Sequence, residues 1–319
     1  MATASRSGTK PPVLLTRRIP SSAVATLEAA CDVERNDGDQ LSPDQLKARL
    51  ADKEGLICLM TDVITPDVMD AAPRLKVIAN VAVGFNNIDV PAARARNVVV
   101  TNTPEVLTGA TADLTWALIL DITRRVSEGD RMIRRGGWKG WAFDFMLGNE
   151  LSGKTLGIIG FGRIGQAVAA RAVPFGLRVI HADVHAVPGS GAIPLDRLLA
   201  TSDIVSIHCP LTPETHHIIN QAALARMKRS AYLINTSRGP VVEEAALAWA
   251  LKNRIISGAA LDVYEDEPRV HPELLTLDNV VLAPHLGSAT TETRTAMADL
   301  AVRNAIAVLT GQAPLTPVP

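Results

Sequence analysis

The strongest signal in this chain is the stretch at residues 160–165, which reads GFGRIG and has the spacing G-x-G-x-x-G. An apolar run typical of a fully buried strand precedes it at residues 156–159, and an alanine-rich helical pattern follows at residues 166–175. In such a strand–turn–helix unit the glycines permit a tight turn, a close approach to a pyrophosphate and close helix packing. The N–H groups at the helix N-terminus then face the phosphates. By itself, the spacing also fits a glycine-rich turn in any α/β protein.

A second apolar run, residues 177–182, ends on Asp183, eighteen positions after Gly165. A carboxylate at this point can accept hydrogen bonds from the hydroxyls of an adenosine ribose. The strand, the turn, the helix and this acid agree with one another. Together they predict a nicotinamide-dinucleotide site with glycine contacts from Gly160, Gly162 and Gly165.

The end of this second strand favours NAD over NADP. An NADP site usually offers an arginine here to bind the 2′-phosphate, and no arginine or lysine lies between Arg178 and Arg197. At ~4 Å and an effective dielectric of ~20, the carboxylate of Asp183 and a phosphate charge would repel by ~4 kcal/mol before screening. His185 can offset a phosphate charge in part, so NADP remains the less favoured cofactor.

Length and composition set the broad class. A chain of 319 residues suggests two domains, and 47% hydrophobic residues are enough for their cores. The net charge of −1 and the pI near 6.7 indicate neither a nucleic-acid partner nor a membrane partner. Residues 1–10 lack the apolar core of a signal peptide, and Cys31, Cys58 and Cys209 lack the spacing of a metal site. We therefore expect a cytoplasmic protein with reduced cysteines and no metal.

Apolar runs alternate with helical patterns along the chain, which predicts an α/β fold with parallel sheets. A nearly uncharged helix is expected from Pro104 to about Arg125 as the connection into a second domain, and another at residues 290–309 as the return to the first. The expected strands lie at residues 13–16, 55–60, 75–79, 98–100, 156–159, 177–182, 204–208, 231–235, 256–263 and 280–282.

Three polar loops follow expected strands of the second half and should meet at one edge of the sheet. Arg238 suits the binding of a carboxylate, because a guanidinium forms two parallel hydrogen bonds with it. His285 suits proton donation to a keto oxygen, and Glu267 beside it would favour the protonated ring. Each residue alone more often has a structural or surface role, so the hypothesis of hydride exchange with a 2-keto acid depends on all three. Structural or surface roles are expected for His181, His208, His216 and His217.

Two further segments leave alternatives open. Residues 80–87 follow a strand of the first half, and they form either a loop whose N–H groups bind a carboxylate or an ordinary strand-to-helix turn. Residues 130–147 look less regular and hold Trp138, Trp141, Phe143 and Phe145 among glycines. These aromatic side chains form either a local core or, as we favour, a subunit contact.

With these motifs in this order, the chain resembles the D-isomer-specific 2-hydroxyacid dehydrogenases, most closely their glyoxylate/hydroxypyruvate reductases. The resemblance implies two Rossmann-like domains with parallel sheets: a discontinuous, flavodoxin-like substrate domain of residues 1–103 and 288–319, and an inserted NAD-binding domain of residues 104–287. It also implies a homodimer formed through the cofactor domain. The matching stretches, which cover nearly the whole length, are residues 81–89, 154–165, 208–212, 235–239, 262–268 and 284–288.

The resemblance assigns catalytic roles to Arg238, Glu267 and His285. It implies that N–H groups of Val83 and Gly84 bind the substrate carboxylate, together with Arg238 and His285. The cofactor contacts that it implies, with those of the glycine-rich turn, are Gly160, Gly162, Arg163, Ile164, Gly165, Asp183, Cys209, Pro210, Thr215, Thr236, Ser237, Arg238, Asp262, His285 and Gly287.

The function implied is reduction of glyoxylate or hydroxypyruvate to the D-2-hydroxy acid. Many glyoxylate reductases use NADPH and carry an arginine near the position of Val184, so their cofactor preference is not carried over. One alternative is a D-3-phosphoglycerate dehydrogenase, whose relatives usually have an arginine in the loop corresponding to residues 80–84, where this chain has none. Another is a dinucleotide-sensing corepressor of the same fold, which would bind the cofactor without turnover.

Overall fold

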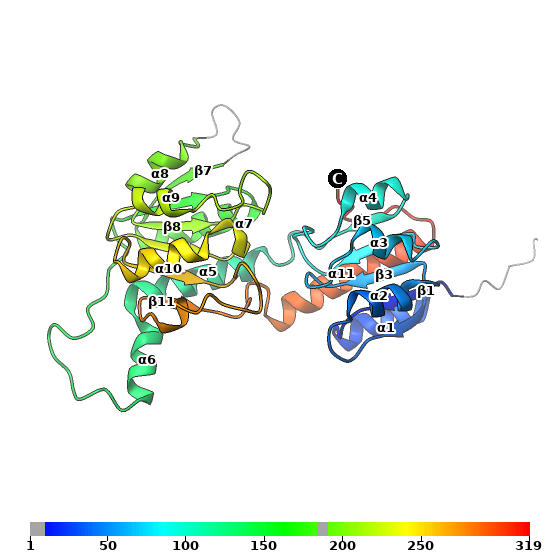
Figure 1. Cartoon of the computed structure of the whole chain (residues 1–319), viewed down its shortest axis with the longest axis horizontal. Coiled ribbons are helices and arrows are strands. Elements are labelled where there is room, and N and C mark those ends of the chain that lie inside the picture. The colour runs from blue at the N-terminus through cyan, green and yellow to red at the C-terminus, as the bar shows by residue number, and fades with distance from the viewer. Residues whose placement is uncertain (1–9, 184–190) are drawn as a thin grey trace, which may run out of the picture. The chain divides into compact units, whose positions relative to one another are not determined.

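The structure, a computed structural model, describes residues 10–183 and 191–319. It divides into two compact units, one of residues up to Leu107 with Thr290–Pro319, the other Thr108–Ala289 (Figure 1). Each unit contains a parallel sheet with helices on both of its faces. The predicted α/β fold with two Rossmann-like units is confirmed.

The sheet of the first unit has the strand order β2-β1-β3-β4-β5. On one face Leu14, Leu56 and Ile78 pack under α2, α3 and α4, and on the other Val13 and Ile57 pack under α1 and α11. The elements are β1 (Pro12–Leu15), α1 (Ser21–Ala30), β2 (Asp32–Arg35), α2 (Pro43–Leu50), β3 (Gly55–Cys58), α3 (Pro66–Asp70), β4 (Val77–Asn80), α4 (Val90–Ala95), β5 (Val99–Thr101) and α11 (Thr291–Leu309).

The sheet of the second unit has the order β11-β10-β9-β8-β6-β7. Strands β6, β8 and β10 are buried along their whole length, which is why they read as continuous apolar runs. The elements are α5 (Thr108–Arg124), α6 (Val126–Arg134), β6 (Thr155–Ile159), α7 (Arg163–Ala172), β7 (Arg178–Ala182), α8 (Leu195–Thr201), β8 (Ile204–Ile207), α9 (Gln221–Arg226), β9 (Tyr232–Asn235), α10 (Glu244–Lys252), β10 (Gly258–Leu261) and β11 (Val280–Leu282), with 3₁₀ turns at Val173–Phe175, Gly239–Val241 and Leu274–Thr276.

Each predicted strand is present, and two elements differ from the sequence prediction. The first is β2, a polar edge strand paired only with β1, which the sequence did not reveal. The second is α6, which occupies part of the segment expected to be less regular. Within the described ranges, no helix is both long and apolar enough to cross a bilayer.

Candidate active site

The glycine-rich turn joins β6 to α7, and its glycines serve different purposes. Gly160 has a φ of +88°, and a Cβ there would lie 2.5 Å from the backbone nitrogen of Cys209. A Cβ on Gly165 would lie 2.3 Å from the carbonyl oxygen of Gly160. Around Gly162, by contrast, the Cβ position is open, and no side chain caps the N-terminus of α7 that it begins. The two outer glycines are therefore required by packing, whereas the middle one leaves room for a phosphate group beside the helix N-terminus.

Asp183 follows β7 and reaches back to the glycine-rich turn. Its Oδ2 atom accepts a hydrogen bond of 2.8 Å from the backbone N–H of Phe161. The Phe161 ring in turn stacks on His181, with ring centroids 3.9 Å apart. The carboxylate thus lies next to the open turn, so these residues fit a dinucleotide whose ribose lies at Asp183. Val184 and His185, which bear on the choice of cofactor, lie outside the described residues.

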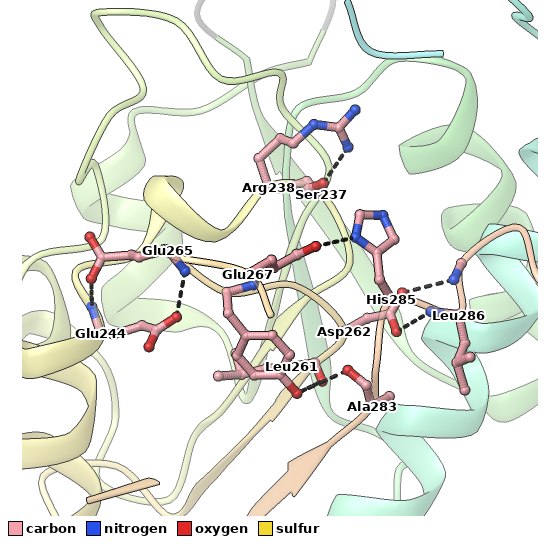
Figure 2. Close-up of polar contacts among 12 residues, drawn as sticks. Ser237, Arg238, Glu244, Leu261, Asp262, Glu265, Glu267, Ala283, His285 and Leu286 are labelled. Carbon is pink, nitrogen blue, oxygen red and sulfur yellow. Dashed lines mark hydrogen bonds and ion pairs between the residues drawn. The ribbon is translucent and has the colours of Figure 1, made fainter. Parts of the chain in front are cut away.

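The three predicted catalytic residues follow three adjacent strands, Arg238 after β9, Glu267 after β10 and His285 after β11. Oε2 of Glu267 lies 2.8 Å from Nδ1 of His285, and Oε1 accepts the N–H of Tyr264 at 3.1 Å. Figure 2 shows the two side chains pointing toward one another, with Arg238 beside them. The fold therefore brings together the groups that the sequence suggested for proton transfer and carboxylate binding.

The charges of this group influence one another. Burial by itself would raise the pKa of Glu267, but the hydrogen bond and charge of His285, the N–H of Tyr264 and the charge of Arg238 together lower it. Burial lowers the pKa of the Arg238 guanidinium, against the opposing effect of Glu267. Glu267 is thus held as a carboxylate, which is the form that stabilises an imidazolium at His285.

The main chain at His285 has a left-handed conformation, with φ 54°, which is uncommon for a residue other than glycine. Asp262, buried at the end of β10, holds this conformation. Its carbonyl oxygen accepts the N–H of His285 at 3.0 Å. Its carboxylate accepts the N–H groups of Leu286 at 2.6 Å and Gly287 at 2.8 Å. Burial raises the pKa of Asp262 in spite of these bonds. Asp262 therefore shapes the loop that presents the imidazole.

Arg238 lies in a loop fixed by its neighbours. The side chain of Asn235 donates to the carbonyl oxygen of Arg238 at 3.0 Å and accepts the N–H and hydroxyl of Ser237 at 3.0 and 2.9 Å. The guanidinium donates to the carbonyl oxygen of Ser237 at 2.7 Å. Gly239 then passes so close to Tyr264 that a Cβ would lie 1.8 Å from its carbonyl carbon. The loops after β9 and β10 are thus packed backbone against backbone.

Several other predicted cofactor contacts have buried side chains that hold their own loops. The hydroxyl of Thr215 donates to the carbonyl oxygen of Pro210 at 2.6 Å. Cys209 packs on Gly160, and burial raises the pKa of its thiol to about 11. The hydroxyl of Thr236 lies 2.9 Å from that of Thr115 on α5. For these residues, contact with a cofactor stays a prediction.

Two predicted cofactor contacts are the first residues of α7, where Arg163 is exposed and Ile164 is half-buried. The predicted structural role of His208 agrees with its burial beside Ser206, which lowers the pKa of the imidazole to about 3. No cluster of three or more His, Cys, Asp and Glu side chains suited to a metal ion occurs among residues 10–183 and 191–319.

In the first unit, the loop after β4 contains the two predicted substrate contacts. The carbonyl oxygens of Val83 and Gly84 accept hydrogen bonds from the side-chain amides of Asn102 at 2.7 Å and Asn80 at 2.9 Å. Among the residues that the structure describes, none accepts a hydrogen bond from the N–H of Val83 or Gly84. Binding of a substrate carboxylate by these N–H groups stays a prediction.

Sequence reasoning missed a set of residues behind the site. Glu265, in the loop that carries Glu267, bonds to both Glu244 and His217. This contact agrees with the structural alternative of the structural or surface role expected for His217. The sequence does show a second glutamate, Glu265, two positions before Glu267. Its role becomes evident only when the conformation of the loop is known.

A glycine-rich turn with an acid at the end of the next strand, beside an arginine and a glutamate–histidine pair, is typical of nicotinamide-dependent oxidoreductases. A family model, "D-isomer specific 2-hydroxyacid dehydrogenase, NAD binding domain", matches residues 116–287. The chain belongs to the D-isomer-specific 2-hydroxyacid dehydrogenases, which are oxidoreductases acting on a CH–OH group, and it contains their NAD-binding domain.

Individual relatives agree with this family. The chain is 50% identical over 317 residues to a glyoxylate reductase of Thermofilum pendens, covering 96% of this chain and 93% of that protein. A crystal structure of a Thermus thermophilus protein is 46% identical with a TM-score of 0.92, covering 97% of this chain and 100% of that one. An NADPH-dependent glyoxylate/hydroxypyruvate reductase of Sinorhizobium meliloti, solved with NADP and malonate, is 35% identical with a TM-score of 0.89, covering 97% of each chain.

Proposed function

We propose that this protein reduces glyoxylate and hydroxypyruvate, with NADH, to the D-2-hydroxy acids. The observation that carries the proposal is the position of Arg238, Glu267 and His285 after adjacent strands of the sheet that also bears the glycine-rich turn. Two of the relatives are a glyoxylate reductase and a glyoxylate/hydroxypyruvate reductase, which supports the choice of substrates.

The roles of the three residues follow from their atoms. Arg238 binds the substrate carboxylate through two N–H groups of its planar fork. Because Nδ1 of His285 faces Glu267, Nε2 is the ring atom that gives a proton to the keto oxygen. The negative charge of Glu267 stabilises the protonated ring before the transfer. The nicotinamide supplies the hydride when it is bound. A general acid of this kind typically contributes a factor of 10² to 10⁴, or ~3–5 kcal/mol.

The two units divide the binding tasks in this proposal. The first unit is the substrate domain, and the N–H groups of Val83 and Gly84 bind the carboxylate of the keto acid. The second unit binds the cofactor at the glycine-rich turn, with Asp183 at the ribose. The carboxylate of Asp183 supports NADH over NADPH, because a 2′-phosphate there would meet a like charge.

A homodimer completes the proposal. Helix α6 has no buried residue, and its Val126 and Ile133 are each 61% exposed. The segment after it carries Trp141, 81% exposed, and Phe143, 87% exposed. Exposed apolar side chains of this size, close together in the sequence, are typical of an interaction site. The partner that we propose is a second copy of this chain, and the compartment is the cytoplasm, which suits the three free and buried cysteines.

The test is a turnover assay with glyoxylate, hydroxypyruvate, pyruvate and 3-phosphohydroxypyruvate, each with NADH and with NADPH. Fast reduction of the two small acids with NADH is expected. In Arg238→Ala the rate of reduction should fall at least ~100-fold. The rate of Arg238→Lys should lie between those of the wild type and Arg238→Ala, because lysine keeps the positive charge but cannot form two parallel hydrogen bonds with a carboxylate. Preference for the phosphorylated acid would instead indicate a phosphoglycerate dehydrogenase, and binding of NADH without turnover would indicate a sensing protein.

A further inference from the structure

The loop that carries Glu267 is anchored on the side away from His285, as Figure 2 shows. Glu244, the first residue of α10, is buried, with 5% of its surface exposed. Its Oε1 atom accepts the N–H of Glu265 at 2.6 Å, while its own N–H donates to Oε2 of Glu265 at 3.0 Å. Its second oxygen accepts the N–H of His271 at 3.1 Å. One carboxylate thus binds the chain both before and after Glu267.

Glu265 extends this anchor to the loop of Arg238. Its Oε1 atom pairs with the ring atom Nε2 of His217. The backbone N–H of His217 donates to the carbonyl oxygen of Pro240 at 2.8 Å. Pro240 lies two residues after Arg238, and Gly239 between them packs on the backbone of the loop after β10. The segments bearing the arginine and the glutamate are therefore joined through this second pair as well.

Two glutamates of this loop, Glu265 and Glu267, lie two positions apart, and each pairs with a histidine from another segment. His217 and His285 both have a left-handed backbone, with φ of 51° and 54°. The pair of Glu267 with His285 belongs to the proposed acid–base chemistry, and the pair of Glu265 with His217 faces α10. The titratable and charged groups around the two pairs are Glu244, His216, His271, Arg238 and Asp262.

We propose that Glu244 is a positioning residue for the acid–base pair, and that it acts by fixing the loop from which Glu267 meets His285. This inference rests on the proposed function. Both oxygens of Glu244 accept backbone N–H groups. In Glu244→Gln, the side-chain NH₂ group would replace one of these oxygens and face a backbone N–H, so that this buried N–H would lose its acceptor. The loop then shifts, and Glu267 moves away from the imidazole.

The test compares Glu244→Gln with the matched control Glu243→Gln. Glu243 is the preceding residue, it is the N-cap of α10, and its side chain makes no capping hydrogen bond, so both variants lose one negative charge at the same helix end. Glu244→Gln is expected to lower kcat about tenfold while KM for NADH stays within about twofold. The pH above which kcat/KM declines should fall, because the carboxylate of Glu267 moves away from the imidazolium. Glu243→Gln should match the wild type in each respect.

A second readout does not need turnover. The NMR titration of the His285 ring, assigned with His285→Asn, should have its midpoint at lower pH in Glu244→Gln. Glu265→Gln, at a half-exposed side chain, provides a further variant should Glu244→Gln not fold, and should shift the same midpoint. A folded variant of either kind with the wild-type midpoint and pH profile would overturn the inference. Failure of the wild type to reduce either small acid would overturn the proposed function instead, and the NMR comparison would still decide the role of Glu244.

Discussion

Nδ1 of His285 lies 2.8 Å from Oε2 of Glu267, although the two residues are eighteen positions apart and follow different strands. The contact depends on the left-handed backbone of His285, which Asp262 holds from below through three hydrogen bonds. The orientation of the His285 ring, the proposed proton donor, is therefore set by the main chain and does not depend on the side-chain rotamer alone. In the proposed mechanism, this arrangement preorganises the ring so that Nε2, and not Nδ1, transfers the proton.

Glu267→Gln should lower kcat/KM for glyoxylate reduction at pH 7 by about 10- to 100-fold, since the imidazolium of His285 loses its counter-charge. The decline of kcat/KM on the alkaline side should begin at lower pH than in the wild type. Steady-state kinetics from pH 5 to pH 9 measure both effects. Glu273→Gln, at an exposed residue six positions after Glu267 that pairs with Lys252, is the control and should leave the profile in place. An unchanged profile in Glu267→Gln would remove Glu267 from the mechanism.

The same variant has a consequence for stability. The folded pKa of Glu267 lies below its ordinary value of 4.5, so its ionised form contributes stability that is present above about pH 4.5 and is lost as the pH falls through the lower folded pKa. The Tm of the wild type should therefore fall more between pH 6 and pH 4 than that of Glu267→Gln. Thermal unfolding at the two pH values measures the difference, and equal slopes would contradict it.

Asp183→Ala should weaken the preference for NADH. Removing the carboxylate takes away a repulsion of about 4 kcal/mol toward a 2′-phosphate, before screening, and also the acceptor for the ribose hydroxyls. The KM for NADH should rise and that for NADPH should fall. Because Asp183 also accepts the N–H of Phe161, Asp183→Asn is the companion variant, as it retains one acceptor oxygen. A wild type that prefers NADPH would show the argument from Asp183 to be wrong.

Much of the site was predictable because it depends on local sequence and on one topological rule. The glycine spacing needs only its flanking strand and helix. Arg238, Glu267 and His285 each follow an apolar run, and the carboxyl ends of parallel strands meet at one edge of a sheet. Sequence reasoning therefore brought these residues together without knowing the order of the strands.

What the sequence could not reveal depends on contacts between distant segments. Nothing near His285 announces a left-handed backbone, because its cause is Asp262 on another strand. Glu244 and His217 similarly gain their roles only when α10 and the preceding loop pack beneath Glu267. The buried hydroxyl of Thr215 is used within its own loop, a detail that a resemblance in sequence does not carry.

Two elements were missed for local reasons. Strand β2 reads DVER and is half exposed at the sheet edge, so it lacks the apolar signature of an inner strand. The end of α5 at Arg124 agrees with the helix end expected at about Arg125, where the backbone is left-handed with φ 59°, and the element that was missed is the helix α6 that begins directly after it. Helix α6 itself has no buried side chain within this chain.

The proposed dimer predicts that Trp141→Ser with Phe143→Ser shifts the protein to a monomer in size-exclusion chromatography with light scattering. These side chains are exposed and make no core, so the fold of the single chain should be kept, as circular dichroism can verify. Leu315→Ser, at another exposed apolar residue in the first unit, is the control and should leave the mass unchanged. A wild type that is already monomeric at micromolar concentration would contradict the proposal.

Gly162→Ala and Gly165→Ala should separate cofactor binding from folding. The methyl group of the Gly162 variant enters open space, so the Tm should be kept while NADH binding weakens at least about tenfold, because the methyl occupies the phosphate position. In the Gly165 variant the methyl group lies 2.3 Å from the carbonyl oxygen of Gly160, so the helix and turn must move apart. We expect a loss of about 3 kcal/mol, or about 10 °C in Tm. Calorimetry without cofactor and fluorescence titration with NADH measure the two effects, and a loss of Tm in Gly162→Ala would show that this glycine serves the fold.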